Sequence, residues 1–265
     1  MKRLIGIIQF MTRIPISVDT GFDEDFHKGI IYFPIVGLVL GICYYLIVLI
    51  GLYFFNTYIA TIMVLVGGVL LTGGLHLDGL GDTFDGLYSY RDKDRILEIM
   101  KDSRLGTNGL LAIMLVLMLK AGFIYEIIDQ YALWILIIMP AAARTMQVFA
   151  CYGTKTPREK GMGNIFIGKV SSKMLIGSYG LFAVVMILAV MIDSRGAISL
   201  FEGVRLALIV AITMVLLAIW TKFFIKSIYK KIDGITGDIL GAICELGELI
   251  FLIMIYLISQ FVWVI

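Results

Sequence analysis

The chain alternates long apolar segments with short polar ones, and this pattern predicts its architecture. A helix needs about 20 apolar residues to cross the hydrocarbon core of a bilayer. Seven apolar segments approach or exceed that length, and they cover residues 30–55, 58–77, 108–127, 131–152, 174–192, 204–223 and 239–262. No alternating ten-residue strand pattern recurs, so these spans are predicted to be helices rather than strands of a barrel.

The first 14 residues have a different pattern. Apolar side chains recur at helical spacing opposite Lys2 and Arg3, but the segment is too short to cross a membrane. Such a helix is expected to lie at the interface between water and lipid. We therefore predict an all-α polytopic membrane helix bundle, with about seven transmembrane helices plus an N-terminal interfacial helix.

Composition supports this prediction and excludes other classes. Hydrophobic residues make up 60% of the chain and its mean hydropathy is +0.97, far above the values of soluble domains. The net charge of only +2 gives no indication of nucleic-acid binding. Gly37 and Gly41 stand four residues apart in the first span, a spacing that favours close helix contact.

The distribution of basic residues predicts an orientation. With the N-terminus in the cytoplasm, the cytoplasmic segments are 1–29, 77–107, 153–173 and 222–238. They hold 18 of the 22 Lys and Arg residues, whereas the outer connections hold only Arg195 and Arg205. By the positive-inside rule we expect a multi-pass protein of the cell (plasma) membrane with a cytoplasmic N-terminus.

An acidic run follows the second span directly. Residues 73–87 read GGLHLDGLGDTFDGL, which places Asp78, Asp82 and Asp85 within about 40° of Asp78 on a helix. Like charges this close are unfavourable unless a cation binds them, and carboxylates favour Mg²⁺. The alternative is a cluster at a helix start on a solvated loop, but the surrounding glycines and leucines do not resemble a solvated surface.

A second acidic stripe opens the last span. Asp238 and Glu245 are seven residues apart and so share a helix face, and Glu248 is the neighbour of Glu245. Carboxylates inside a membrane span usually have a function, and the orientation puts this stripe on the cytoplasmic side as well.

Several basic residues are candidates for holding an anion. Arg144 lies within the span 131–152 and is predicted near the acidic site, whereas Lys120 in the span 108–127 has no evident partner. Arg13 is either an interfacial anchor or a ligand for an anion. The loop 100–109 precedes a helix and could present N–H groups to phosphate.

Two carboxylate clusters and several cations on one face suit one kind of chemistry. A diphosphate needs metal ions to neutralise its charge and cations to position it, and phosphoryl transfer depends mainly on positioning and electrostatic stabilisation. A spare carboxylate could take the proton of an attacking hydroxyl. The residues thus indicate a metal-dependent phosphotransferase at a membrane face.

The run 73–87 also resembles the signature of the cobalamin synthase family, the adenosylcobinamide-GDP ribazoletransferases. Further segments that match the family are 12–15, 33–37, 100–107 and 234–241, followed by Glu245 and Glu248. Gly81, Leu105 and Asp233 stand where the family pattern suggests Ala, Ile and Gly, and none of these departures removes a charged group assigned to chemistry.

The resemblance implies a reaction that requires Mg²⁺. Adenosylcobinamide-GDP is joined to α-ribazole, or to α-ribazole 5′-phosphate, and GMP is released. The product is adenosylcobalamin or its 5′-phosphate, at the last assembly stage of cobalamin biosynthesis. The whole chain, 1–265, is then a single integral-membrane catalytic domain in contact with the lipid bilayer, with no nucleic-acid partner and with a homo-oligomer left open.

The resemblance also implies roles for individual residues. The expected Mg²⁺ ligands are Asp78, Asp82, Asp85, Asp238, Glu245 and Glu248. The expected catalytic residues are Asp82, Asp85 and Glu245. The expected substrate-binding residues are Arg13, His76, Asp102, Arg104, Arg144 and Lys231. His76 lies about 200° from Asp78 on a helix, which favours a packing or supporting role over direct ligation.

Two other functions compete with this one. A protein similar to the CDP-alcohol phosphotransferases would use analogous chemistry, but the spacing of aspartates typical of that family is absent. An ion-coupled transporter would place carboxylates at the membrane midplane within paired repeats, and no convincing repeat is present. The identity of the general base, the number of metal ions and the choice between free and phosphorylated ribazole stay open at this point.

Overall fold

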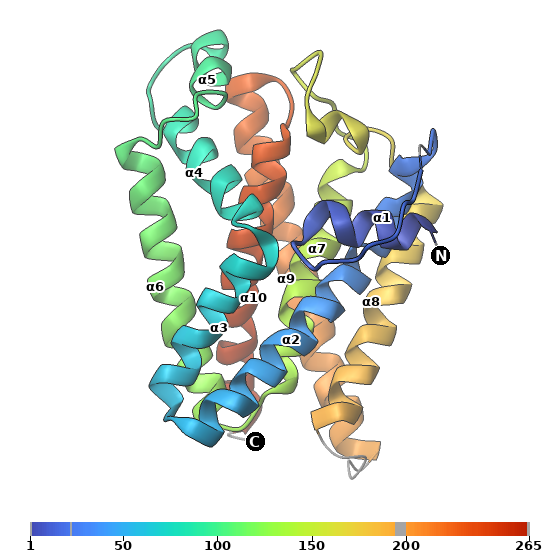
Figure 1. Cartoon of the computed structure of the whole chain (residues 1–265), viewed down its shortest axis with the longest axis vertical. Coiled ribbons are helices and arrows are strands. Elements are labelled where there is room, and N and C mark those ends of the chain that lie inside the picture. The colour runs from blue at the N-terminus through green and yellow to red at the C-terminus, as the bar shows by residue number, and fades with distance from the viewer. Residues whose placement is uncertain (1, 22, 194–199, 264–265) are drawn as a thin grey trace.

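The protein is helical throughout the part that the computed structural model describes, residues 2–21, 23–193 and 200–263 (Figure 1). Arg195, which entered the charge count of the outer connections, lies outside the described residues. The elements are α1 (Lys2–Met11), η1 (Phe26–Tyr32), α2 (Phe33–Phe54), α3 (Thr57–Thr72), α4 (Leu75–Leu87), α5 (Lys93–Ile99), α6 (Thr107–Asp129), α7 (Trp134–Cys151), η2 (Met162–Ile165), α8 (Ser172–Asp193), α9 (Leu200–Ile232) and α10 (Gly237–Trp263). The all-α prediction is confirmed.

Six helical segments of the described chain are long and apolar enough to cross a membrane. They are Phe26–Phe54, Thr107–Asp129, Trp134–Cys151, Ser172–Ile192, Phe201–Ile232 and Gly237–Gln260. A seventh crossing is formed only if α3 and α4 are taken together, and these two helices meet at an angle of 90°. The predicted number of about seven therefore agrees with the structure, with one crossing broken.

The break falls at Gly73 and Gly74, inside the predicted span 58–77. Both glycines have left-handed backbones, with φ of 64° and 71°, a conformation that side-chain-bearing residues adopt only at a cost. Helix α3 consequently ends at Thr72, and the acidic run starts a new helix with its own direction. The carboxylates of α4 are thus aimed by packing against neighbouring helices and not by α3.

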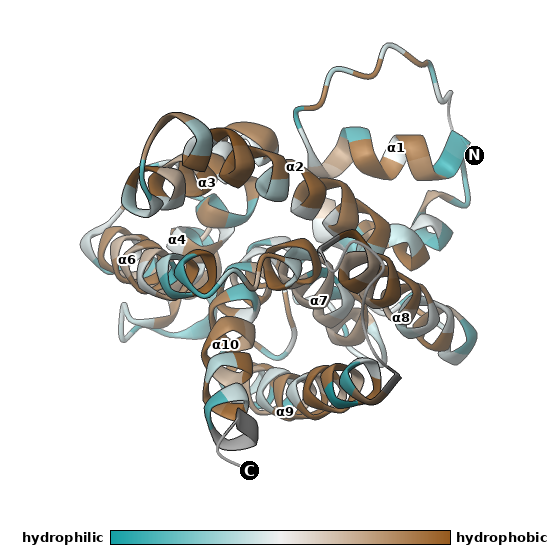
Figure 2. Ribbon diagram, turned by 90° about the horizontal axis from the view of Figure 1, so that it is seen from below, coloured by the Kyte–Doolittle hydropathy of each residue, from teal (hydrophilic) through white to brown (hydrophobic). Residues whose placement is uncertain are grey.

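Helix α7 lies at the centre of the bundle. Figure 2 shows it surrounded by α2, α8, α9 and α10, and almost all of its residues are buried. Gly37 and Gly41 of α2 lie directly against the backbone of α7, where any side chain would collide with Ala141 or Ile137. The close helix contact predicted from these two glycines is confirmed.

A second glycine contact joins α4 to α10. A Cβ atom on Gly79 would lie 2.8 Å from the backbone oxygen of Asp238, and one on Gly241 would lie 3.1 Å from the backbone oxygen of His76. The two backbones can approach this closely only because neither position has a side chain. This contact brings the start of the second acidic stripe against the first.

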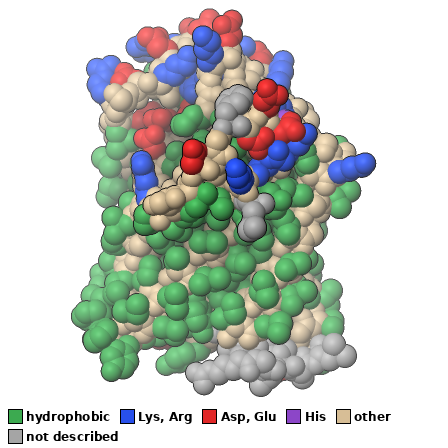
Figure 3. Space-filling model, turned by 45° about the vertical axis from the view of Figure 1, so that its right-hand side comes forward, with side chains coloured by type: hydrophobic (Ala, Val, Ile, Leu, Met, Phe, Trp, Pro, Cys, Tyr) green, Lys and Arg blue, Asp and Glu red, His purple; other side chains and the backbone are tan. Residues whose placement is uncertain are grey.

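Charged side chains gather at one end of the molecule, as Figure 3 shows, and hydrophobic side chains dominate the remaining described part of the visible face. Figure 1 shows that this end is formed by helices α4 and α5 and by the loop before α8. Helix α1 buries Gly6, Ile7 and Met11 against the bundle, in agreement with its predicted amphipathic character.

Candidate active site

A cavity of about 370 Å³ opens between several segments of the chain. Its wall is built by α1, the start of α2, the first turn of α4, α7, the loop 158–166 and the start of α10, and Met100 and Lys101 after α5 complete it. Phe10, Phe33 and Phe166 contribute an aromatic side, where Phe33 and Phe166 pack edge to face with ring centroids 5.2 Å apart. The opposite side is polar and includes Asp78 and Asp238.

Three carboxylates crowd at this polar edge. Asp78 and Asp238 line the cavity, and Asp82, one turn further along α4, is half-buried. Of the like charges that act on Asp82, those of Asp78 and Asp238 have the largest effect, followed by that of Asp85. Asp78 and Asp82 form no ion pair with any residue in the described ranges. The two acidic stripes therefore do meet, through Asp238 rather than along their full length.

No preformed metal site accompanies this crowding. Within residues 2–21, 23–193 and 200–263, no three His, Cys, Asp or Glu side chains are grouped closely enough to hold a metal ion as they stand. Side-chain rearrangement around a bound ion would be needed to complete a ligand set.

Asp85, the third aspartate of α4, has a structural role that differs from the positions of Asp78 and Asp82. Its carboxylate oxygens accept hydrogen bonds from the backbone N–H groups of Gly106, at 2.7 Å, and Gly109, at 2.8 Å. These groups belong to the amino end of α6. The first N–H groups of a helix have no acceptor within the helix, and this end carries a partial positive charge. Side chains at either glycine would collide with Asp85. Asp85 thus fixes α6 to α4.

We predict that Asp85→Asn lowers thermal stability in detergent by about 1–2 kcal/mol, because an amide can accept from only one of the two N–H groups. Differential scanning fluorimetry of the purified protein measures the change. Asp92→Asn is the matched control, since Asp92 caps the exposed α5 by accepting from the backbone N–H of Arg95 and asparagine caps equally well. Unchanged stability of Asp85→Asn, together with a raised Mg²⁺ requirement, would instead indicate a metal ligand.

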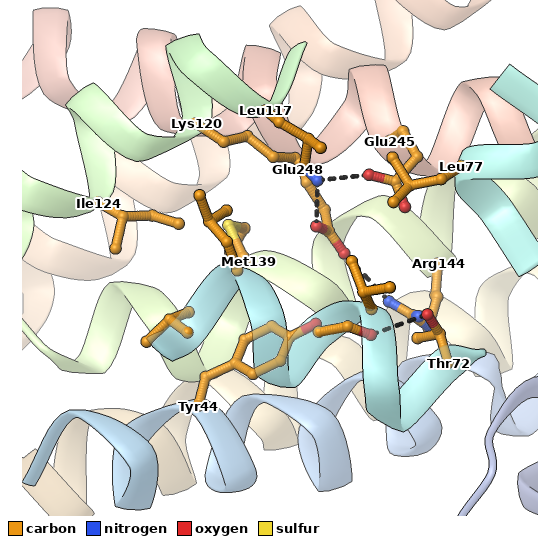
Figure 4. Close-up of a pocket in the computed structure, with 14 residues that line it drawn as sticks. Tyr44, Thr72, Leu77, Leu117, Lys120, Ile124, Met139, Arg144, Glu245 and Glu248 are labelled. Carbon is orange, nitrogen blue, oxygen red and sulfur yellow. Dashed lines mark hydrogen bonds and ion pairs between the residues drawn. The ribbon is translucent and has the colours of Figure 1, made fainter. Parts of the chain in front are cut away.

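Glu245 and Glu248 lie deeper, in a buried ion network (Figure 4). The Nζ atom of Lys120 is 2.7 Å from an oxygen of each glutamate. Arg144, which is 1% exposed, approaches the other oxygen of Glu248 at 3.2 Å. Two cations and two anions therefore balance, and this gives Lys120 the partners that the sequence did not reveal.

The network adjoins a separate cavity of about 30 Å³, only large enough for about one water molecule. Tyr44, Thr72 and Met139 contribute to its wall. The last two carboxylates of the second acidic stripe thus face a small cavity with their own cations, whereas Asp238 faces the larger cavity.

His76 connects the two regions. It is 4% exposed, lines the larger cavity and packs its backbone against Gly241. Its Nδ1 atom lies 3.5 Å from a guanidinium nitrogen of Arg144. These contacts fit the packing or supporting role favoured by its helical position.

The other basic candidates lie outside the walls of the larger cavity. The side chain of Arg13 lies against Gly73 at the break between α3 and α4, and its backbone N–H donates to Leu71. Lys231 donates to the backbone oxygen of Leu87 at 2.7 Å, where it neutralises the carboxyl end of α4.

Asp102 and Arg104 form an exposed pair. The nitrogens of Arg104 reach the carboxylate at 2.6 and 3.0 Å, and this hydrogen bonding lowers the pKa of Asp102 to about 2. The pair is consequently fully charged near neutral pH. It belongs to the loop that leads into α6, beside the charged end of the bundle.

Two cavity residues were missed by sequence reasoning. Arg158 pairs with Asp238 at 2.8 Å, while its Nε and Nη2 atoms are buried without a partner. Gln147 donates to the backbone oxygen of Leu240, and its Oε1 atom is likewise buried and unpartnered. The available signals were weak: an arginine near a glycine-rich loop, and one amide in an apolar span.

Comparison with known proteins gives one consistent family. The family model described as cobalamin-5-phosphate synthase matches residues 3–256. A protein of Clostridioides difficile (strain 630) named adenosylcobinamide-GDP ribazoletransferase is 53% identical over 97% of this chain and 98% of its own length. Proteins of the same name from Alkaliphilus metalliredigens and Clostridium acetobutylicum are 46% and 40% identical, each over 98% of this chain and over 96% and 98% of their own lengths. No solved structure is significantly similar.

Proposed function

Because this chain belongs to the cobalamin-5-phosphate synthase family, we propose that it joins adenosylcobinamide-GDP to α-ribazole, or to α-ribazole 5′-phosphate, at the larger cavity. The observation that carries the assignment of the site is the meeting of Asp78 and Asp238 at the polar edge of that cavity, with Asp82 one turn further along α4 and under the repulsion of both. The enzyme is a transferase of cobalamin biosynthesis embedded in a membrane.

The same three carboxylates are the proposed ligands of Mg²⁺. They suit a hard divalent cation because they are acidic oxygen donors, crowded together, and Asp78 and Asp82 have no ion-pair partner among the described side chains. When bound, Mg²⁺ would neutralise the diphosphate and stabilise the phosphate that leaves. Glu245 and Glu248 are omitted from this proposal, since Lys120 and Arg144 already neutralise them.

The residues of the chain then have the following tasks in the transfer. A ribose hydroxyl of the ribazole attacks the phosphorus atom that carries the cobinamide, its oxygen forms the new P–O bond, and the bond to GMP breaks. One carboxylate at the polar edge accepts the proton of the hydroxyl. The aromatic side of the cavity excludes water, which would otherwise compete as the attacking group.

We further propose that the charged end of the bundle faces the cytoplasm at the cell membrane. The support is the concentration of 18 of the 22 Lys and Arg residues in the connections assigned to that side. Both substrates would then arrive from the cytoplasm.

The proposal is tested by supplying the purified protein, in lipid nanodiscs, with adenosylcobinamide-GDP and Mg²⁺. We expect GMP to be released only when α-ribazole or its 5′-phosphate is also present, and release to stop when EDTA removes the metal. Equal release without a ribazole would contradict the transfer. Turnover of a CDP-linked alcohol would favour the alternative enzyme family, and ion uptake without any turnover would favour a transporter.

A further inference from the structure

Arg158 lies in the cavity wall with most of its hydrogen-bonding capacity unused. A guanidinium group has five N–H donors in a planar fork. Here Nη1 contacts Asp238 at 2.8 Å, whereas Nε and Nη2 are buried and have no partner among the described residues. Leaving buried donors unsatisfied costs free energy, so such groups in a native protein normally have a hydrogen-bond partner, which at a binding site can be supplied by the ligand.

The backbone holds this arginine in place. The N–H group of Arg158 donates to the hydroxyl of Thr156, and its carbonyl oxygen accepts from the side chain of Asn164 at 2.8 Å. The loop is fixed to α10 in turn, since a Cβ atom on Gly163 would lie 2.6 Å from the backbone nitrogen of Gly237. The unused donors are therefore presented by a rigid support.

Gln147 contributes an unused acceptor to the same cavity. It is 2% exposed, and its NH₂ group is occupied by the backbone oxygen of Leu240, which leaves Oε1 free to accept. A ligand that satisfies both residues must combine an anionic oxygen pair for Arg158 with a hydroxyl or N–H donor for Gln147. Lys101 and Lys160 add positive charge at the rim.

The size of the cavity further restricts which ligands can bind there. At about 370 Å³ it is near the lower end of small-molecule pockets, which span roughly 300–1,000 Å³. One nucleotide fits that volume, but a corrin macrocycle with its side chains does not. On the aromatic side, Phe33 and Phe166 are almost fully buried, and the partly exposed Phe10 offers ring surface to a flat heterocyclic base.

We propose that Arg158 binds the phosphate of a ribonucleoside 5′-phosphate group seated in this cavity, and that Gln147 accepts a hydrogen bond from its sugar. The proposal rests on the function given above and names the part of the substrates that the cavity holds. Two groups share this chemistry: α-ribazole 5′-phosphate, and the guanylyl half of adenosylcobinamide-GDP. The corrinoid ring itself stays outside the cavity.

Steady-state kinetics of Arg158→Gln test the proposal and distinguish the two sources. Losing a charge-assisted pair of hydrogen bonds is expected to raise the KM of the affected substrate by roughly 10- to 100-fold. If the phosphate is that of the ribazole, KM rises for α-ribazole 5′-phosphate and not for free α-ribazole. If it is that of the guanylyl group, KM for adenosylcobinamide-GDP and the inhibition constant of GMP rise with either acceptor.

Two further variants separate binding from a structural role. Arg158→Lys keeps a cation beside Asp238 but cannot form the planar fork, so it should fold and give an intermediate KM. Arg95→Gln, on the exposed surface of α5, is the matched control and should leave every constant unchanged. KM values and GMP inhibition within twofold of the wild type in both Arg158 variants would overturn the proposal and leave Arg158 only as the partner of Asp238.

Discussion

Replacing Asp82 with asparagine is expected to lower the rate of GMP release at limiting Mg²⁺ by roughly 100- to 1,000-fold. Asp82 is half-buried and is repelled most strongly by Asp78 and Asp238, so its carboxylate adds to the negative charge that attracts a cation there. Asparagine keeps the shape of the side chain and removes its charge. The measurement is the rate as a function of Mg²⁺ concentration, which should show a raised half-saturating value.

The control for this substitution is Asp94→Asn, a loss of the same charge in the exposed first turn of α5. It should leave the Mg²⁺ dependence unchanged. A wild-type rate for Asp82→Asn at limiting Mg²⁺ would show that the metal is not held at the polar edge of the larger cavity.

Replacing Lys120 with methionine is expected to destabilise the protein by about 3–5 kcal/mol, the range seen when one partner is removed from a buried ion pair. Lys120 is 4% exposed and lies 2.7 Å from both Glu245 and Glu248, so its loss leaves two buried carboxylates with Arg144 alone. Unfolding by denaturant in detergent, followed by circular dichroism, measures the loss.

Charge balance offers an internal check on this prediction. The double variant Lys120→Met with Glu245→Gln again has one cation and one anion, and it should regain much of the lost stability. Leu119→Met, at a neighbouring exposed position, controls for methionine in α6. Equal stability of Lys120→Met and Leu119→Met would contradict the role given to the network.

The same variants address the function of the two glutamates. The network lines a different cavity from Asp78 and Asp238, so folded Lys120→Met protein should keep the wild-type half-saturating Mg²⁺ concentration. A changed Mg²⁺ requirement would return Glu245 and Glu248 to the set of metal ligands expected from the family resemblance.

The sequence predicted the membrane helices well because each is a continuous apolar run. It did not predict the break in the second span, where the apolar run continues through Gly73 and Gly74 but the helix ends before them. The two glycines are visible in the sequence, but the 90° angle between α3 and α4 depends on how α4 packs against α10. Hydropathy counts apolar residues and contains no information about that contact.

At the site, the sequence placed both stripes on one side of the membrane, which allowed Asp78 and Asp238 to meet but did not establish that they do. The sequence did not reveal that Asp238 is separated from Glu245 and Glu248. This separation depends on Lys120, which is 125 residues away from Glu245 in the chain, and helical spacing along α10 cannot reveal a partner on another helix. The capping role of Asp85 was hidden for a similar reason, because its partners are backbone groups at the amino end of α6, 21 and 24 residues further on.

The position of Arg144 has a consequence for how the protein is made. An arginine at the middle of a membrane helix makes insertion less favourable by about 2.5–3.5 kcal/mol, and α7 carries it beside Pro140 in the least apolar of the six unbroken spans. Its partner Glu248 follows 104 residues later, so the ribosome completes α7 long before it synthesises α10. During that interval the central helix of the bundle carries an uncompensated charge, and only the arrival of the last helix allows the core to close.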